Sequence, residues 1–146
     1  MTTSSVDQQI RTRLADVGVR YTAGRQQVAT ALLAAEGPRS AAELHVQLGS
    51  AIPLSSLYRS LAVMAEAGVL APHHGSQGVT RYELAEWLSG HHHHVVCVDC
   101  GNVDDISLPE ALESTLHDLV ETVASGSYFV AIGHALEVQG RCKACA

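Results

Sequence analysis

Positive charge is scarce in this sequence. Its 146 residues include a single lysine, Lys143, and eight arginines against fifteen acidic residues, which gives a formal net charge of −6. Nucleic-acid binding usually depends on a basic surface, because contacts with phosphate supply much of the affinity. Averaged over the whole chain, the composition therefore argues against nucleic acid as a partner.

Long apolar segments are also missing. The sequence has no run of about 18 apolar residues, the length that a membrane-spanning helix needs, although 47% of its residues are hydrophobic and can form a core. The first residues contain neither the basic start nor the apolar stretch of a secretory signal. We therefore expect a cytoplasmic protein with no membrane partner, in which disulfide bonds are not favoured.

The charge is distributed unevenly along the chain. Residues 1–89 contain seven arginines and seven acids, whereas residues 90–146 contain two basic residues, eight acids, all four cysteines and six of the nine histidines. The whole negative surplus lies in the second part, and the first part is neutral. Residues 11–25 carry four arginines and one acid, a local charge of +3 that could contact phosphate. We expect the two parts to be different domains.

Apolar residues recur at helical spacing in four segments of the first part. The predicted helices are 6–17, 26–35, a third that is capped by Ser40 and ends before Gly49, and a fourth from Pro53 to Gly68. Ser55 is expected to accept hydrogen bonds from the first free amides of the fourth helix. Residues 69–71 and 80–84 read as strands joined by a turn at 75–78. Helices followed by a hairpin are typical of a winged helix.

The second part reads as a small α+β domain. Its predicted elements are strands at 95–98, 103–106 and 134–138 and a helix over 109–124. The predicted fold class is thus α+β, an N-terminal winged helix-turn-helix domain followed by a smaller domain. The expected boundaries are 1–85 for the first domain, 86–90 for a hinge and 91–146 for the second domain.

The four cysteines form two CxxC pairs. A gap of two residues lets both sulfurs of a turn reach one ion, and two such pairs make a tetrahedral thiolate site. The predicted structural zinc ligands are Cys97, Cys100, Cys142 and Cys145. A redox dithiol or unpaired core cysteines are the alternatives, but a redox CxxC normally opens a helix, and both pairs here lie beside predicted strands. Closed four-sulfur coordination leaves no position for catalysis.

Four consecutive histidines, 91–94, precede the first CxxC pair. In an extended segment alternate side chains point to opposite faces, so the run can supply two ligand pairs to two different sites. A solvated histidine tract is the alternative. The candidates for further ligands are Glu83, Asp105, Glu113 and His134, and His73 and His74 could also serve. Imidazole and carboxylate ligands suit Fe(II), Mn(II), Zn(II) or Ni(II) without choosing among them.

Several segments together have the pattern of a known family. They are LSSLYRSL (54–61), YEL (82–84), HHHHVVCVDCG (91–101) and HALEVQGRCKAC (134–145). In this order they resemble the ferric uptake regulator family of bacterial metal-responsive repressors, and the resemblance runs from about Val19 to Cys145.

The resemblance implies a homodimer whose second domains pair and whose winged helices bind a palindromic DNA operator when a sensing metal is bound, with no small organic substrate. It implies structural zinc on the four cysteines, a sensing site of Glu83, His92, His94 and Asp105, and a second site of His91, His93, Glu113 and His134. It implies that Tyr58 and Arg59, with Ser55 and Ser56, face DNA from the recognition helix and that Arg25 approaches phosphate.

Two departures bear on the sensing metal. Pro38 stands where iron sensors often place a histidine ligand, and the chain lacks the cysteine that zinc sensors frequently carry between 83 and 90. The sequence Tyr82-Glu83-Leu84 is that of iron sensors, so Fe(II) is favoured over Zn(II). A peroxide-responsive regulator of the same family is one alternative function. A zinc enzyme is another, although the sequence has no HExxH motif.

Overall fold

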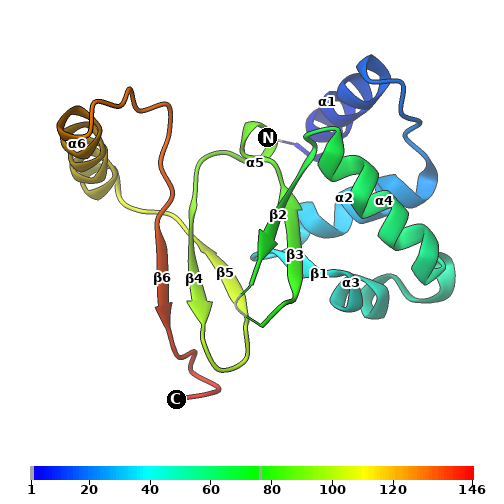
Figure 1. Ribbon diagram of the computed structural model, residues 1–146. Coiled ribbons are helices and arrows are strands. Elements are labelled where there is room, and N and C mark those ends of the chain that lie inside the picture. Colours follow the sequence, from blue (N-terminus) through cyan, green and yellow to red (C-terminus); the bar gives the residue numbers. More distant parts are fainter. Residues whose placement is uncertain (1, 76) are drawn as a thin grey trace.

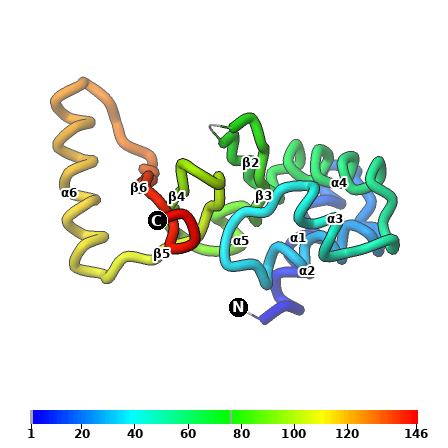
Figure 2. The backbone as a smooth tube through the Cα atoms, turned by 90° about the horizontal axis from the view of Figure 1, so that it is seen from below, coloured from blue at the N-terminus to red at the C-terminus, as the bar shows by residue number. Residues whose placement is uncertain are grey.

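The computed structural model describes residues 2–75 and 77–146. The first part of the chain gathers its helices around a small sheet, and the second part forms another small sheet and one long helix that stands apart in both views (Figures 1 and 2). Among these residues no helix combines the length and the apolar character needed to cross a membrane. The predicted α+β class is confirmed, with a winged helix preceding a smaller α+β domain.

Four helices build the first part, as their periodicity predicts. They are α1 (Thr3–Asp16), α2 (Ala23–Ala34), α3 (Ala41–Leu48), which is followed by the 3-10 turn η1 (Gly49–Ala51), and α4 (Leu54–Glu66). Their apolar stripes meet in one core, where Ile10, Leu14, Val28, Leu44, Leu57, Leu61 and Met64 are almost completely buried. Because burial of each such side chain is worth about 1.5–3 kcal/mol, this core is a main source of stability for the first part.

The two predicted helix caps have different outcomes. Ser40 caps α3 through a reciprocal pair of bonds, in which the Glu43 N–H donates to Ser40 Oγ (3.2 Å) and the Ser40 N–H donates to Glu43 Oε2 (2.7 Å). The prediction for Ser55 was wrong, because Pro53 occupies the cap position of α4 and no side chain caps that helix. Helical backbone begins at Leu54, so Ser55 lies inside the first turn.

A three-stranded antiparallel sheet completes the first part. Its strands are β1 (Arg39–Ser40), β2 (Leu70–His74) and β3 (Thr80–Leu84), in the order β1-β3-β2. Strand β1 was not predicted, and β2 extends further than expected. The predicted turn at 75–78 includes Ser76, which lies outside the described residues. The hairpin register pairs Ala71 with Glu83 and His73 with Arg81.

The segment expected to be a hinge contains a short helix, α5 (Glu86–Ser89). Leu88 of this helix is 2% exposed and belongs to the core of the first part. Gly90 follows with a φ of +86°, a left-handed conformation that favours glycine. The chain therefore stays anchored to the winged helix up to Leu88 and turns toward the histidine run at Gly90.

The second part contains a sheet and a crossover helix. Strands β4 (His93–Cys97), β5 (Val103–Ile106) and β6 (Glu137–Gly140) are arranged in the order β5-β4-β6, and α6 (Glu110–Gly126) lies between β5 and β6 in the chain. Strands β4 and β6 are parallel, which requires a long crossover of the kind that α6 and residues 127–136 provide. The prediction of a strand from 134 was wrong, because β6 first pairs with β4 at Glu137.

The second part has few buried side chains. Among the described residues, those buried in it are His93, Cys97, Val103 and Ala124. Helix α6 leaves Leu112, Leu119 and Val123 more than half exposed, and Phe129, Val130 and Ile132 after it are more exposed still. The second part therefore needs stabilisation from something other than its own apolar core.

Candidate metal centres and candidate DNA-binding helix

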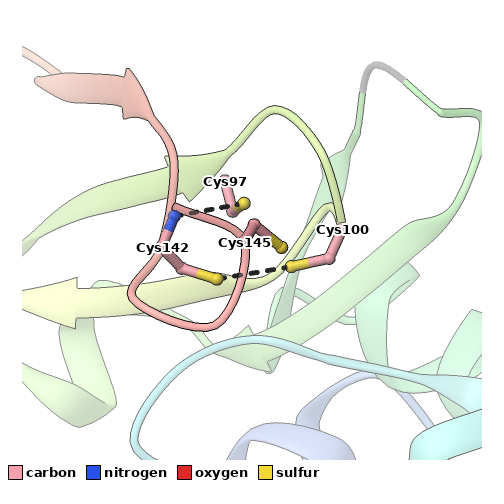
Figure 3. A group of neighbouring side chains, drawn as sticks. All are labelled: Cys97, Cys100, Cys142 and Cys145. Carbon is pink, nitrogen blue, oxygen red and sulfur yellow. Dashed lines mark hydrogen bonds between the residues drawn. The ribbon is translucent and has the colours of Figure 1, made fainter.

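The four cysteines come together from two distant parts of the chain (Figure 3). Cys97 ends β4 and Cys100 follows in the turn, while Cys142 and Cys145 lie in a loop after β6, which is parallel to β4. All four sulfurs lie within 4.8 Å of one another. Pairing of β4 with β6 thus brings the two CxxC segments to the same end of the sheet.

The sulfur spacing fits a tetrahedral zinc ion. Bonds of about 2.3 Å to zinc place neighbouring sulfurs about 3.8 Å apart, and Cys100 Sγ lies 3.8 Å from Cys142 Sγ. All four thiols are free. Backbone N–H groups of Cys100 and Cys142 lower the pKa of Cys97 to about 6, whereas the neighbouring cysteines raise the pKa of Cys145 to about 12. The raised pKa of Cys145 reflects the cost of placing several thiolates side by side, which a bound cation would relieve.

The histidine run divides between two clusters. His92 and His94 join Glu83 and Asp105, and His91 and His93 join Glu113 and His134. The residues in each of these groups are those named from the sequence. The division follows from extended backbone, in which successive side chains point to opposite faces.

The first cluster contains donors from both parts of the chain. Glu83 Oε2, from β3, lies 2.9 Å from His92 Nε2 and 3.2 Å from His94 Nε2. Asp105 Oδ1, from β5, lies 3.5 Å from His92 Nε2 and 3.4 Å from His94 Nε2. Bonds near 2.1 Å give donor separations of about 3.0 Å in an octahedral site and about 3.4 Å in a tetrahedral one, so the observed spacing suits a divalent ion of either geometry.

The two carboxyl groups of this cluster have opposite pKa shifts. Burial alone would raise the pKa of Glu83, but hydrogen bonds with His73, His94 and His92 hold it well below its usual value. Burial and the negative charge of Glu83 raise the pKa of Asp105. Two partly buried carboxyl groups that share a site repel each other when both are charged, and a divalent cation would offset that repulsion.

The second cluster is centred on Glu113 of α6. Its Oε1 lies 3.0 Å from His91 Nε2 and 2.9 Å from His134 Nε2, and its Oε2 lies 2.9 Å from His93 Nε2. His93 is 1% exposed. The hydrogen bond with His93 lowers the pKa of Glu113. Three imidazoles and one carboxylate are a set that suits Zn(II), Fe(II), Mn(II) or Ni(II).

Two contacts around these clusters were not predicted from the sequence. Glu86 of α5 hydrogen-bonds His91 Nδ1 and is the main cause of the raised pKa of His91. His73 of β2 contacts Glu83, with its Nε2 2.7 Å from Glu83 Oε1. A carboxylate on the far nitrogen of a ligating histidine is a common outer partner of metal sites. The sequence held a partial signal for His73, as a histidine near Glu83 in the hairpin, and none for Glu86.

The predicted DNA-facing residues lie mostly on the exposed side of α4. Ser55, Ser56, Tyr58 and Arg59 are exposed, whereas Leu57, Ser60, Leu61 and Met64 are buried. Arg25 lies in the first turn of α2, where its N–H donates to the capping Thr22 Oγ1 (3.3 Å) and its guanidinium donates to Arg20 O. Helix α4 thus presents a hydroxyl-rich face with one arginine, which can enter a DNA groove.

Known proteins are similar in sequence to most of this chain. The family model described as "Ferric uptake regulator family" matches residues 16–138. The ferric uptake regulation protein of Vibrio anguillarum is 33% identical over 134 residues, which cover 88% of this chain and 85% of that protein. The ferric uptake regulation protein of Neisseria meningitidis is 34% identical over 97 residues, but the match spans only 62% of its length and 66% of this chain.

A solved structure has the same fold. The ferric uptake regulator of Vibrio cholerae, whose crystal structure is described as revealing a rearrangement of the DNA-binding domains, matches with a TM-score of 0.69 at 29% identity and covers 90% of this chain and 98% of that chain. The family match, the relatives and the fold agree: this chain belongs to the ferric uptake regulator family.

Proposed function

We propose that this protein is a metal-dependent transcriptional repressor of metal uptake or homeostasis genes, which acts in the cytoplasm and binds a palindromic operator as a homodimer when its sensing metal is bound. The observation that carries the proposal is the cluster of Glu83, His92, His94 and Asp105. Glu83 belongs to the wing strand β3, whereas the other three belong to the second part of the chain. Regulators of this family are not enzymes, which removes the support for a zinc enzyme.

The mechanism we infer is a clamp between the two parts of the chain. A bound divalent ion would supply one positive centre that is shared by donors of both parts. Glu83 then holds the wing at a defined angle to the strand that carries His92 and His94. A ligand shifts a conformational equilibrium only by its differential affinity for the two states. Four donors converge only when the two parts are docked, so metal binding favours the docked state.

DNA binding is assigned to α4. Its exposed face contains Ser55, Ser56, Tyr58 and Arg59, and the locally basic segment 11–25 precedes it in a neutral first part. A recognition helix in the major groove, repeated by dimer symmetry, reads two half-sites of a palindrome. Because this surface has few positive charges, we expect modest non-specific affinity and a shallow salt dependence.

The homodimer is assigned to the exposed apolar face of the second part. The exposed side chains there are Leu112, Leu119, Val123, Phe129, Val130 and Ile132. Exposed apolar surface of this extent is typical of an interface rather than of a free monomer. The same face explains how a domain with so few buried residues is stabilised.

Each of the three clusters is assigned a metal. We assign structural zinc to the four cysteines, because their spacing is that of a closed tetrahedral site. We assign the sensing metal to the Glu83 cluster and place Fe(II) ahead of Zn(II), since the curated relatives named above are ferric uptake regulation proteins. The His91, His93, Glu113 and His134 cluster is assigned as a second divalent site.

The test uses DNA that the protein selects for itself. Duplexes are selected from a randomised library by the wild-type protein loaded with Fe(II) without oxygen, and binding is then titrated with and without metal. We expect His92→Ala to lose the metal dependence while keeping its cysteine-bound zinc, and the exposed His117→Ala to behave as wild type. Unchanged metal dependence in His92→Ala contradicts the sensing-site assignment, and failure to select any duplex contradicts the DNA-binding function.

A further inference from the structure

Two adjacent histidines of the wing point to opposite sides of β2. His73 pairs across the hairpin with Arg81, and Ala71 pairs with Glu83. Side chains directly opposite each other share a face, and so do residues two apart along a strand. His73 and Glu83 therefore lie diagonally on one face, the face that the second part of the chain covers. His74 lies on the other face, where its Nδ1 is 3.2 Å from Thr80 Oγ1.

His73 contacts only one of the two oxygens of Glu83. His73 Nε2 lies 2.7 Å from Glu83 Oε1, whereas His92 Nε2 and His94 Nε2 approach Glu83 Oε2, at 2.9 and 3.2 Å. The Glu83 side chain is 12% exposed, so little water competes for either oxygen. One oxygen of the Glu83 carboxylate thus contacts His73, and the other contacts the histidines of the cluster.

We propose that His73 is a positioning residue of the sensing site: its ring N–H holds Glu83 Oε1, so that Glu83 presents Oε2 alone to the metal. The inference rests on the proposed function of the Glu83 cluster as the sensing site. A carboxylate oxygen that accepts a hydrogen bond is held in place, and such outer partners commonly contribute about 10- to 100-fold in metal affinity.

The geometry separates this role from that of a fifth ligand. The four donors of the cluster lie within 4.8 Å of one another. Glu83 Oε2 contacts the two histidines of the cluster, whereas His73 contacts Oε1. The His73 ring meets the His94 ring edge to face, with 4.5 Å between the centroids, which keeps its plane in place. Through Glu83, both strands of the wing are coupled to the metal, β3 directly and β2 through His73.

The first test measures metal affinity. All proteins carry His134→Ala to disable the second site and keep zinc on the cysteines, and Co(II) is the probe, titrated against a competing chelator. We expect His73→Ala to weaken Co(II) binding on the order of tenfold. His73→Gln should recover most of the loss, because its amide N–H can reach the same oxygen. His74→Ala, the neighbouring histidine on the other face, should match the parent. Equal affinity of His73→Ala and the parent overturns the proposal.

The second test counts imidazoles on the metal. Each Co(II)-bound imidazole gives one hyperfine-shifted, exchangeable N–H resonance in proton NMR, and we expect two resonances in the parent and two in His73→Ala. Three in the parent and two in the variant would make His73 a ligand and overturn the positioning role. A Glu83→Ala control distinguishes failure of the positioning role from failure of the sensing-site assignment. If Glu83→Ala binds Co(II) like the parent, the sensing-site assignment itself fails, whatever the effect of His73→Ala.

Discussion

The two parts of the chain touch backbone to backbone at Gly37, and Gly37→Ala tests whether this contact supports metal binding. A Cβ at Gly37 would lie 2.3 Å from Val103 O and 2.9 Å from Asp104 Cα. Since ordinary contacts need about 3.5 Å, the two backbones must separate by roughly 1 Å. The adjacent hydrogen bond, which the Asp105 N–H donates to Glu36 O at 3.0 Å, would then be lost or weakened.

The magnitude follows from that hydrogen bond. A bond of this kind contributes about 0.5–1.5 kcal/mol net, and 1.4 kcal/mol is a factor of ten in affinity. Because Asp105 is one of the four donors, we expect Gly37→Ala to weaken binding at the sensing site roughly two- to tenfold. The cysteine-bound zinc should be unchanged, since the three atoms nearest to the added Cβ belong to Val103 and Asp104 and none belongs to a cysteine.

The assay is Co(II) competition with a chelator in the His134→Ala background, with zinc content measured in parallel. Gly24→Ala is the matched control, because the nearest atom to its added Cβ is Ile52 Cδ1 at 3.8 Å, an ordinary contact. Wild-type affinity in Gly37→Ala would refute the reasoning, as it would mean that the docked backbones do not hold Asp105 in the cluster.

Three further predictions concern the cysteine cluster, the pH dependence of stability and the dimer interface. Cys142→Ser should lose the structural zinc and lower the melting temperature of the second part, because that part buries little else; metal analysis and calorimetry measure both. Burial opposes protonation of His92, but hydrogen bonds to Glu83 and Gly90 raise its pKa. Protonated His92 therefore stabilises the fold, fully at pH values below the unfolded pKa of about 6.5, and this stabilisation is lost as the pH rises through the folded pKa. The metal-free protein should thus melt at a lower temperature at about pH 8 than at about pH 6. The metal-loaded protein should melt at a higher temperature at about pH 8 than at about pH 6 in the same thermal scans, because fewer protons compete with the metal for His92 at the higher pH. Phe129→Asp, at a position 74% exposed, should produce monomers that keep their zinc, measured by light scattering; a dimer at the same concentration would place the interface elsewhere.

The division of the histidine run follows from local sequence, whereas the full ligand set of each cluster was predicted from the resemblance to the ferric uptake regulator family. The alternation of an extended strand separates His92 and His94 from His91 and His93 on residue numbers alone. The role of His73 depends on the register of a hairpin, and the contact of Gly37 depends on how two backbones dock. The sequence offers only a histidine near Glu83 as a signal for the first contact and none for the second, so both contacts emerge from the folded structure.

The ends of the elements were the least predictable part of the fold. Ser55 has the chemistry of a cap, but Pro53 already supplies the extended backbone at that position. His134 lies in an apolar stretch that suits a strand, yet pairing with β4 begins only at Glu137. In both places a preference of the local sequence yielded to the geometry of neighbouring residues.

Four identical residues in a row cannot by themselves fix the register in which β4 pairs with its neighbours. If β4 slipped by one residue against β5, His93 rather than His94 would stand opposite Asp105, and each face would still receive imidazoles. Cys97 has no such substitute, because a slip would replace it with Val96 and remove one sulfur from the zinc cage. The place of Cys97 in the four-cysteine cluster therefore fixes the register of β4, and with it which histidines face the Glu83 cluster.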